Sequence, residues 1–231
     1  MRPHLFIVLL LASATTPAWA RGTIDRVQIR GLEDREALEH NVRLALGVND
    51  AVGKVQGESR LEFLLLSAER EARQALEPFG YYSPTITVDA PRDANDHILV
   101  TVNVDRGEPV RVRGSEVAIV GPGGEDRYLA DDLAAFRPRT GEVFNHATYE
   151  ASRDGISRRL AERGYFDADF MSREVRGTRA DLAADIDLVW DSGFRYDMGP
   201  TTFHQEFFRP GLLDKLVTWE EGSYFHQGKL D

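Results

Sequence analysis

Gly80-Tyr81-Tyr82 recurs 84 residues later as Gly164-Tyr165-Phe166, and this repeated triplet divides the whole chain. Each triplet follows a helical pattern, and a glycine just past a helix end can adopt the left-handed backbone that ends the helix. The aromatic residues behind each glycine are large enough to wedge between a helix and a sheet, so Tyr82 and Phe166 are predicted to lie in the core. A triplet repeated in the same structural context indicates tandem copies of one small domain.

The first copy is predicted to have the element order β-α-α-β-β. Apolar residues spaced by three and four predict helices, whereas strict alternation of apolar and polar residues predicts a strand with one buried face. The copy contains a strand at 24–31, a helix at 38–46, a polar loop at 48–57, a helix at 61–76, and strands at 85–88 and 98–104. The first helix is expected to bury Leu38, Val42, Leu44, Ala45 and Leu46.

The second copy repeats this order, and a third copy begins after it. The second contains a strand at 110–120, helices at 128–136 and 148–163, and strands at 169–175 and 182–190. Gly141-Glu142-Val143-Phe144 recurs loosely 81 residues later as Gly222-Ser223-Tyr224-Phe225, which indicates the third start. Near it, residues 195–203 are predicted as a strand and 210–216 as a short helix. A segment this short is expected to be poorly ordered by itself.

The fold class predicted from these patterns is α+β. Each complete copy is expected to form a three-stranded mixed sheet with two helices on one face, which is a small two-layer domain. The predicted divisions are a signal peptide at 1–20, a first repeat at 21–107, a second repeat at 108–193 and the start of a truncated third repeat at 194–231.

The N-terminus has the layout of an export signal. Arg2 precedes an apolar run at 5–11, and Ala18-Trp19-Ala20 gives the small-x-small pattern at which signal peptidase cleaves. The apolar run is too short to cross about 30 Å of hydrocarbon as a helix. The chain is therefore predicted to be exported, with the mature protein beginning at Arg21.

The composition excludes several classes of function. The formal net charge is −10, which argues against binding to nucleic acid or anionic lipid, because both require a basic surface. Cysteine is absent, which excludes disulfide-rich scaffolds, thiolate zinc sites and cysteine nucleophiles.

No motif for catalysis or for a cofactor stands out. The stretch 47–55 resembles a phosphate-binding loop, but five residues separate its glycines and Val55 replaces the serine or threonine that would hold magnesium. The histidines of the mature chain, at 40, 97, 146, 204 and 226, show neither i, i+4 pairing nor an HExxH frame. We therefore expect a non-enzymatic protein with no cofactor and no metal.

An export signal followed by tandem β-α-α-β-β units with a glycine-aromatic-aromatic step resembles the POTRA repeats of TamA-like outer-membrane assembly proteins, in the BamA-type superfamily. The likeness is carried by the two triplets and by the strand starts at 26–31 and 194–200. It implies a place on the periplasmic side of the outer membrane of a Gram-negative bacterium. It also implies a TamB-like partner anchored in the inner membrane and unfolded outer-membrane clients of the autotransporter kind. A full member continues into a membrane barrel, so the sequence is interpreted as the N-terminal POTRA repeats only.

The resemblance also implies where a partner would bind. In POTRA-like folds the second strand lies at a sheet edge, where an extended segment of another protein can pair through main-chain hydrogen bonds. The candidate edge residues are Thr85, Ile86, Thr87 and Val88 in the first repeat and Asp169, Phe170, Met171 and Ser172 in the second. Each net hydrogen bond contributes about 0.5–1.5 kcal/mol, so one edge supports only transient binding. Pro84 and the charged residues at these edges would also limit self-association.

Two other functions remain open at the level of the sequence. The same repeats could belong to a two-partner secretion transporter, although such transporters typically carry two repeats and here a third begins. The chain could instead be a periplasmic enzyme whose acid and histidine side chains form a site that no motif reveals. Binding of extended peptides favours a POTRA module, whereas a bell-shaped pH profile of activity favours an enzyme.

Overall fold

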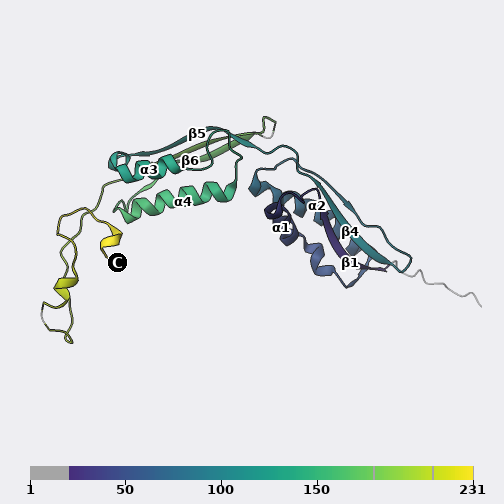
Figure 1. Ribbon diagram of the computed structural model, residues 1–231, viewed down its shortest axis with the longest axis horizontal. Helices are drawn as coiled ribbons and strands as arrows, with labels where there is room; N and C mark the ends of the chain where they lie inside the picture. Colours follow the sequence, from purple (N-terminus) through teal and green to yellow (C-terminus); the bar gives the residue numbers. More distant parts are fainter. Residues whose placement is uncertain (1–20, 179, 210, 231) are drawn as a thin grey trace, which may run out of the picture.

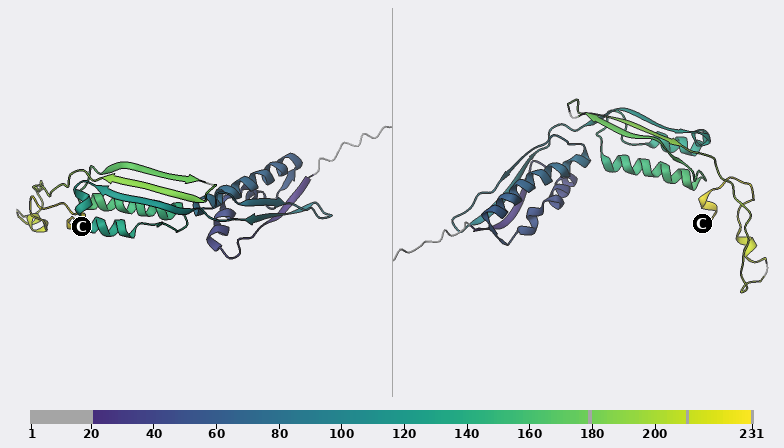
Figure 2. Two further views of the ribbon diagram at one scale, coloured as in Figure 1. Left: turned by 90° about the horizontal axis from the view of Figure 1, so that it is seen from above. Right: turned by 180° about the vertical axis from the view of Figure 1, so that it is seen from behind.

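The computed structural model describes residues 21–178, 180–209 and 211–230. Two α+β domains lie end to end, and residues 194–230 extend beyond the second one (Figure 1). The predicted signal peptide at 1–20 lies outside the described residues. The predicted α+β class is confirmed, and the helices of each domain cover one face of its sheet (Figure 2).

The first domain carries the predicted elements and one additional strand. Its elements are β1 (Arg21–Arg30), α1 (Glu36–Ala45), η1 (Gly47–Ala51), β2 (Val55–Gly57), α2 (Glu58–Leu76), η2 (Glu77–Phe79), β3 (Thr85–Asp89) and β4 (His97–Asp105). The strand order is β2-β1-β4-β3, with β1 parallel to β4 and the other pairs antiparallel. The prediction of a loop at 48–57 and of three strands is wrong here, because β2 pairs with the first residues of β1. Three residues are too few to show any periodicity.

The second domain has three strands, as predicted. Its elements are β5 (Arg111–Val120), η3 (Pro122–Glu125), α3 (Arg127–Ala135), α4 (His146–Glu162), β6 (Asp169–Thr178) and β7 (Ala183–Asp191). The strand order is β5-β7-β6, with β5 parallel and β6 antiparallel to β7. Asp126 and Asn145 cap the two helices by accepting hydrogen bonds from the backbone amides of Tyr128 and Thr148.

Each domain has its own hydrophobic core. The buried residues form two clusters with no common member, one centred on β1, β4 and α2 and the other on β7 and α4. Val100 in the first cluster and Leu188 in the second are fully buried. In α1, Leu38 and Val42 face the core as predicted, but Leu44 points to solvent, because it lies two positions from Val42 on a helix that repeats every 3.6 residues.

The two triplets place their aromatic rings differently from the prediction. Tyr81 and Tyr165 are buried, with 9% and 3% of their surface exposed, whereas Phe166 is 51% exposed. The backbone amides of Tyr81 and Tyr165 donate hydrogen bonds to the carbonyls of Leu76 and Leu160 near the ends of α2 and α4. These bonds keep the first ring of each triplet close to the end of its helix. The second ring of the first triplet does not pack in its own repeat. Tyr82 is half-buried and packs against the core of the second repeat.

Residues 194–230 contain little regular structure. Their elements are one isolated bridge between Asp197 and Tyr224 and two short 3₁₀ helices, η4 (Leu213–Leu216) and η5 (Gln227–Lys229). The predicted strand at 195–203 forms only that bridge, and the predicted helix at 210–216 is a single 3₁₀ turn. Neither hydrophobic core includes a described residue of this segment, and Phe207 is 96% exposed.

Because each repeat has its own core, we expect a core mutation in one repeat to leave the stability of the other nearly unchanged. Leu188→Ala is expected to destabilise the second repeat by about 2–5 kcal/mol, because it removes buried methyl groups and leaves a cavity. Hydrogen exchange read by mass spectrometry should show lost protection in β5, β6 and β7, with β1 and β4 nearly unchanged. Val100→Ala is the matched variant and should give the opposite pattern. Loss of protection throughout both repeats in either variant would contradict independent cores.

Candidate binding site

A main-chain hydrogen bond joins the first and second repeats, and two further ones within the second repeat hold the residues around it. The amide of Val110 donates to the carbonyl of Gly80 over 2.8 Å, and the amide of Phe144 donates to the carbonyl of Val110 over 2.9 Å. One residue further, the amide of Val112 bonds to the carbonyl of Glu142 over 2.9 Å. Gly80, which follows α2 and η2, is thereby attached through backbone atoms to the residue that precedes β5. We call this contact the first joint.

An equivalent arrangement, which we call the second joint, recurs where the second repeat meets the segment that follows it. The amide of Tyr196 donates to the carbonyl of Gly164 over 2.8 Å, and the amide of Phe225 donates to the carbonyl of Tyr196 over 2.9 Å. The amide of Met198 bonds to the carbonyl of Ser223 over 2.7 Å, in the place of the Val112 bond. The equivalence of Gly141-Glu142-Val143-Phe144 with 222–225 therefore reflects one backbone geometry used twice.

Glycine is required at the first joint for two reasons. Gly80 has a φ of +90°, a left-handed conformation that side chains disfavour. A Cβ atom at this position would lie 2.8 Å from the carbonyl oxygen of Phe144 and 2.9 Å from Cγ1 of Val143. The close approach of the two backbones is possible only because no side chain stands between them.

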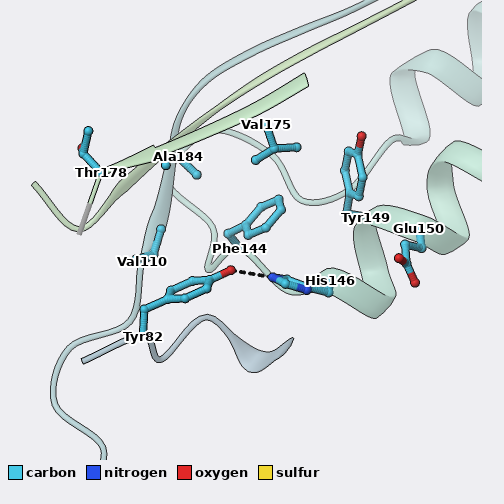
Figure 3. A pocket seen from close by; sticks show the side chains of 10 residues that line it. Tyr82, Val110, Phe144, His146, Tyr149, Glu150, Val175, Thr178 and Ala184 are labelled. Carbon is cyan, nitrogen blue, oxygen red and sulfur yellow. Dashed lines mark hydrogen bonds between the residues drawn. The ribbon is translucent and has the colours of Figure 1, made fainter. Parts of the chain in front are cut away.

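An aromatic cluster surrounds the first joint (Figure 3). The hydroxyl of Tyr82, from the first repeat, forms a hydrogen bond of 2.5 Å with Nε2 of His146 at the start of α4. The ring of His146 lies 5.2 Å from the ring of Phe144, and Phe144 lies 5.8 Å from Tyr149. At the second joint, Phe166 replaces the tyrosine and packs on the ring of Phe225 at 4.8 Å.

Beside this cluster lies a cavity of about 440 Å³. Its walls include Tyr82 from the first repeat, the rings of Phe144, His146 and Tyr149, and Val175 and Gly177 of strand β6. Burial raises the pKa of Tyr149, and the nearby guanidinium groups of Arg153 and Arg173 oppose part of this rise. The lining of the cavity is predominantly apolar, with the side chains of His146, Glu150 and Thr178 as its other members.

Strand β6 forms one wall of the cavity and an open edge of the sheet. Leu182 and Ser192, which flank β7, form backbone hydrogen bonds with Arg111 and Val120 of β5. The backbone N–H and C=O groups of the even-numbered residues of β7 therefore point toward β5, and those of the odd-numbered residues point toward β6. In an antiparallel pair only alternate residues are hydrogen bonded. Arg173, Val175 and Gly177 lie opposite even-numbered residues, so their N–H and C=O groups point away from β7. No strand of the described residues pairs with this side.

The structure places both sequence-predicted segments at sheet edges. Thr85, Ile86, Thr87 and Val88 belong to β3, and Asp169, Phe170, Met171 and Ser172 begin β6. Ile86 and Phe170 also contribute to the cores, since Ile86 is buried and the Phe170 ring packs 5.2 Å from Trp190. Residues 173–178 of β6, beside the cavity, were not among the predicted site residues, and the predicted strand ended at Val175. The charged residues of this segment and Gly177 hide the strand pattern, and only the apolar Val175 in its middle hinted at it.

Two other kinds of feature, a metal-binding cluster and a membrane-spanning helix, do not occur among the described residues. Within them, no group of three histidine, aspartate or glutamate side chains is placed to hold a metal ion. None of the helices in this part of the chain combines the length and apolar character needed to cross a membrane.

Comparison with known families gives two matches. Residues 26–106 match the family model described as POTRA domain TamA domain 1, and residues 113–193 match the POTRA model described as surface antigen variable number repeat. Both ranges fall within the repeats predicted from the sequence.

Solved structures with similarity to the chain include three POTRA-containing or related proteins. POTRA domains 3–5 of BamA from Haemophilus influenzae are 18% identical, with a TM-score of 0.44 over 91% of this chain and 82% of that one. POTRA domains 1–3 of the periplasmic domain of Omp85 from Anabaena are 15% identical, with a TM-score of 0.38 over 90% and 81%. CdiB from Escherichia coli is 12% identical, with a TM-score of 0.30 over 80% and 29%. Scores of this size support no argument, so the assignment rests on the two family matches.

The glycine at the first joint can be tested with a matched pair of variants. Gly80→Ala should loosen the joint, because its Cβ collides with Phe144, whereas Gly141→Ala has a similar φ of +87° but nothing within 4 Å of its Cβ. The backbone strain of about 1–2 kcal/mol is shared by both variants. The chain has no cysteine, so Glu62→Cys and Arg158→Cys allow one spin label in each repeat. The distance distribution between the labels should broaden in Gly80→Ala and stay narrow in Gly141→Ala; equal distributions would show that the clash does not matter.

Proposed function

Because the chain belongs to the POTRA domain family of the BamA-type superfamily, with a first repeat of the TamA type, we propose that it is the periplasmic binding portion of an outer-membrane assembly or translocation factor resembling TamA. In this role it holds an extended segment of a client or partner by strand pairing. It offers backbone groups and apolar surface rather than catalytic groups, and it acts without enzymatic activity. The open edge of β6 is the observation that carries the proposal.

The β6 edge has the groups that strand pairing requires. Arg173, Val175 and Gly177 present unpaired N–H and C=O groups along one line, so an added strand can continue the ladder. At about 0.5–1.5 kcal/mol for each net hydrogen bond, such a short edge gives weak and reversible binding. Reversible binding suits a protein that passes unfolded clients onward.

The edge of the first repeat offers a second, shorter place for pairing. Strand β3 has five residues, and its exposed Thr85, Thr87 and Asp89 alternate with buried or half-buried residues. Two weak edges on one chain raise the effective concentration of a client that is long enough to reach both. We therefore expect clients to be long extended segments rather than short peptides.

The partners in this proposal follow from the TamA type of the first repeat. They are a TamB-like protein anchored in the inner membrane and unfolded outer-membrane clients of the autotransporter kind. The export signal predicted at 1–20 is consistent with a periplasmic location. The TamA-type match favours this role over that of a two-partner secretion transporter. Co-purification with a TamB-like protein would separate the two roles.

Proline at Arg173 tests the pairing directly. Arg173→Pro removes an N–H that points away from β7, so the sheet keeps its own hydrogen bonds while an added strand loses one of its bonds and meets the proline ring. Binding of a labelled extended peptide, read by fluorescence anisotropy, should weaken about tenfold, equivalent to about 1.4 kcal/mol. Arg173→Ala is the control for the lost side chain and should bind like the unmodified chain. Equal binding by both variants, with circular dichroism unchanged, would exclude pairing at β6.

A further inference from the structure

We propose that the cavity at the first joint is a selectivity pocket, which receives a large apolar side chain, above all an aromatic one, from an extended segment paired with β6. This inference rests on the proposed function, because it assumes a strand on the β6 edge. It adds a chemical preference that backbone pairing alone does not provide. The occupant is a polypeptide whose apolar residues stand at alternate positions.

The geometry of β6 joins the edge to the cavity. Val175 and Gly177 have their backbone groups at the open edge, and the same two residues line the cavity. Side chains of neighbouring strands on one sheet face lie about 4.5–5.5 Å apart, so a residue paired beside them points its side chain into the same space. A strand paired with β6 therefore directs every second side chain toward the sheet face of the cavity, and the side chains paired with Val175 and Gly177 lie closest to it.

Gly177 leaves the side of the cavity that adjoins the β6 edge free of a side chain. It has no side chain, and a Cβ built on it would meet only the carbonyl oxygen of Ala183, at 3.9 Å. Its φ lies outside the left-handed region, so the backbone accepts other residues at this position. The glycine is therefore not needed for the turn of the chain or for packing of the protein itself. Its lack of a side chain leaves space that a partner can occupy.

The chemistry of the walls favours an aromatic occupant. Phe144, Tyr149 and Tyr82 contribute rings, and Val175 contributes methyl groups (Figure 3). Aromatic pairs in edge or offset arrangements add about 0.5–1.5 kcal/mol to simple burial. The volume of about 440 Å³ is within the range of ligand pockets in proteins and exceeds that of a single phenylalanine side chain.

The joint itself is part of this pocket. Tyr82 comes from the first repeat, whereas the other walls belong to the second. The hydrogen bond from Tyr82 to His146 fixes the tyrosine ring at the cavity wall. Any rotation of the first repeat against the second would move this wall, so the shape of the pocket depends on the contact between the two repeats.

Two peptides and two glycine variants test the pocket. The probes are fluorescein-labelled peptides of equal length, one alternating threonine with phenylalanine and one alternating threonine with alanine. Gly177→Leu fills this side of the cavity, at the β6 edge, from within the protein. Gly155→Leu adds the same side chain on α4, where nothing lies within 4 Å of the Cβ and the cavity is not affected. Anisotropy titrations of the full chain give the dissociation constants.

The expected result is a preference that depends on residue 177. The unmodified chain and Gly155→Leu should bind the phenylalanine peptide about tenfold more tightly than the alanine peptide, equivalent to about 1.4 kcal/mol. Gly177→Leu should bind both peptides equally, at the strength of the alanine peptide. A preference that survives in Gly177→Leu, or equal binding of both peptides by the unmodified chain, overturns the pocket while leaving edge pairing in place. If the unmodified chain binds neither peptide, the proposed function itself fails, and the pocket fails with it.

Discussion

The arrangement of the repeats depends on the close approach of two backbones at a glycine. The carbonyl of Gly80 accepts a hydrogen bond from Val110, and the carbonyl of Phe144 comes so near that no Cβ fits between them. Because the bonds are made by main-chain atoms, the side chains around them can change while the geometry persists. The second joint shows this: Tyr196 stands where Val110 stands in the first, and the same bonds form at Gly164.

Side chains make the two joints chemically different despite their common backbone. At the second, Phe166 packs on Phe225, and the buried carboxylate of Asp126 pairs with Arg163 at 2.6 Å and lies 3.6 Å from Arg195. The Phe166–Phe225 and Asp126–Arg195 contacts attach the following segment to the second repeat, whereas the Asp126–Arg163 pair lies within that repeat. At the first joint, Tyr82 forms a hydrogen bond with His146, and a cavity lies beside the pair. Pockets of about 420 and 360 Å³ also lie beside the second joint, but mostly charged and tyrosine side chains line them, whereas the cavity at the first joint is predominantly apolar. The same backbone scaffold thus yields two joints whose adjoining spaces differ in chemistry.

Much of the fold could be predicted from the sequence, because the repeat and the periodicity depend on residues within one helix or one strand. Strict alternation identified β4 and β7, and the glycine of each triplet located the helix ends. The direction of the second aromatic ring was not predictable in this way, since it depends on the neighbouring repeat. Strand β2 and the last three residues of β6, 176–178, were missed for a related reason: their pairing is determined by partners distant in sequence. The cavity could not be foreseen at all, because its walls come from both repeats.

An open strand edge is a liability unless something limits what pairs with it. On β6 the exposed side chains of Arg173, Glu174 and Arg176 are charged, which disfavours pairing between two copies of the chain. Charge alone, however, does not select among unfolded segments. Hydrogen bonds to the backbone also depend little on sequence, because every residue except proline has the same N–H and C=O groups. Selection therefore has to come from side chains that reach a defined environment, and along this edge the apolar cavity at Gly177 is the environment that a paired strand meets. Weak pairing with one discriminating contact allows a client to be recognised and still released.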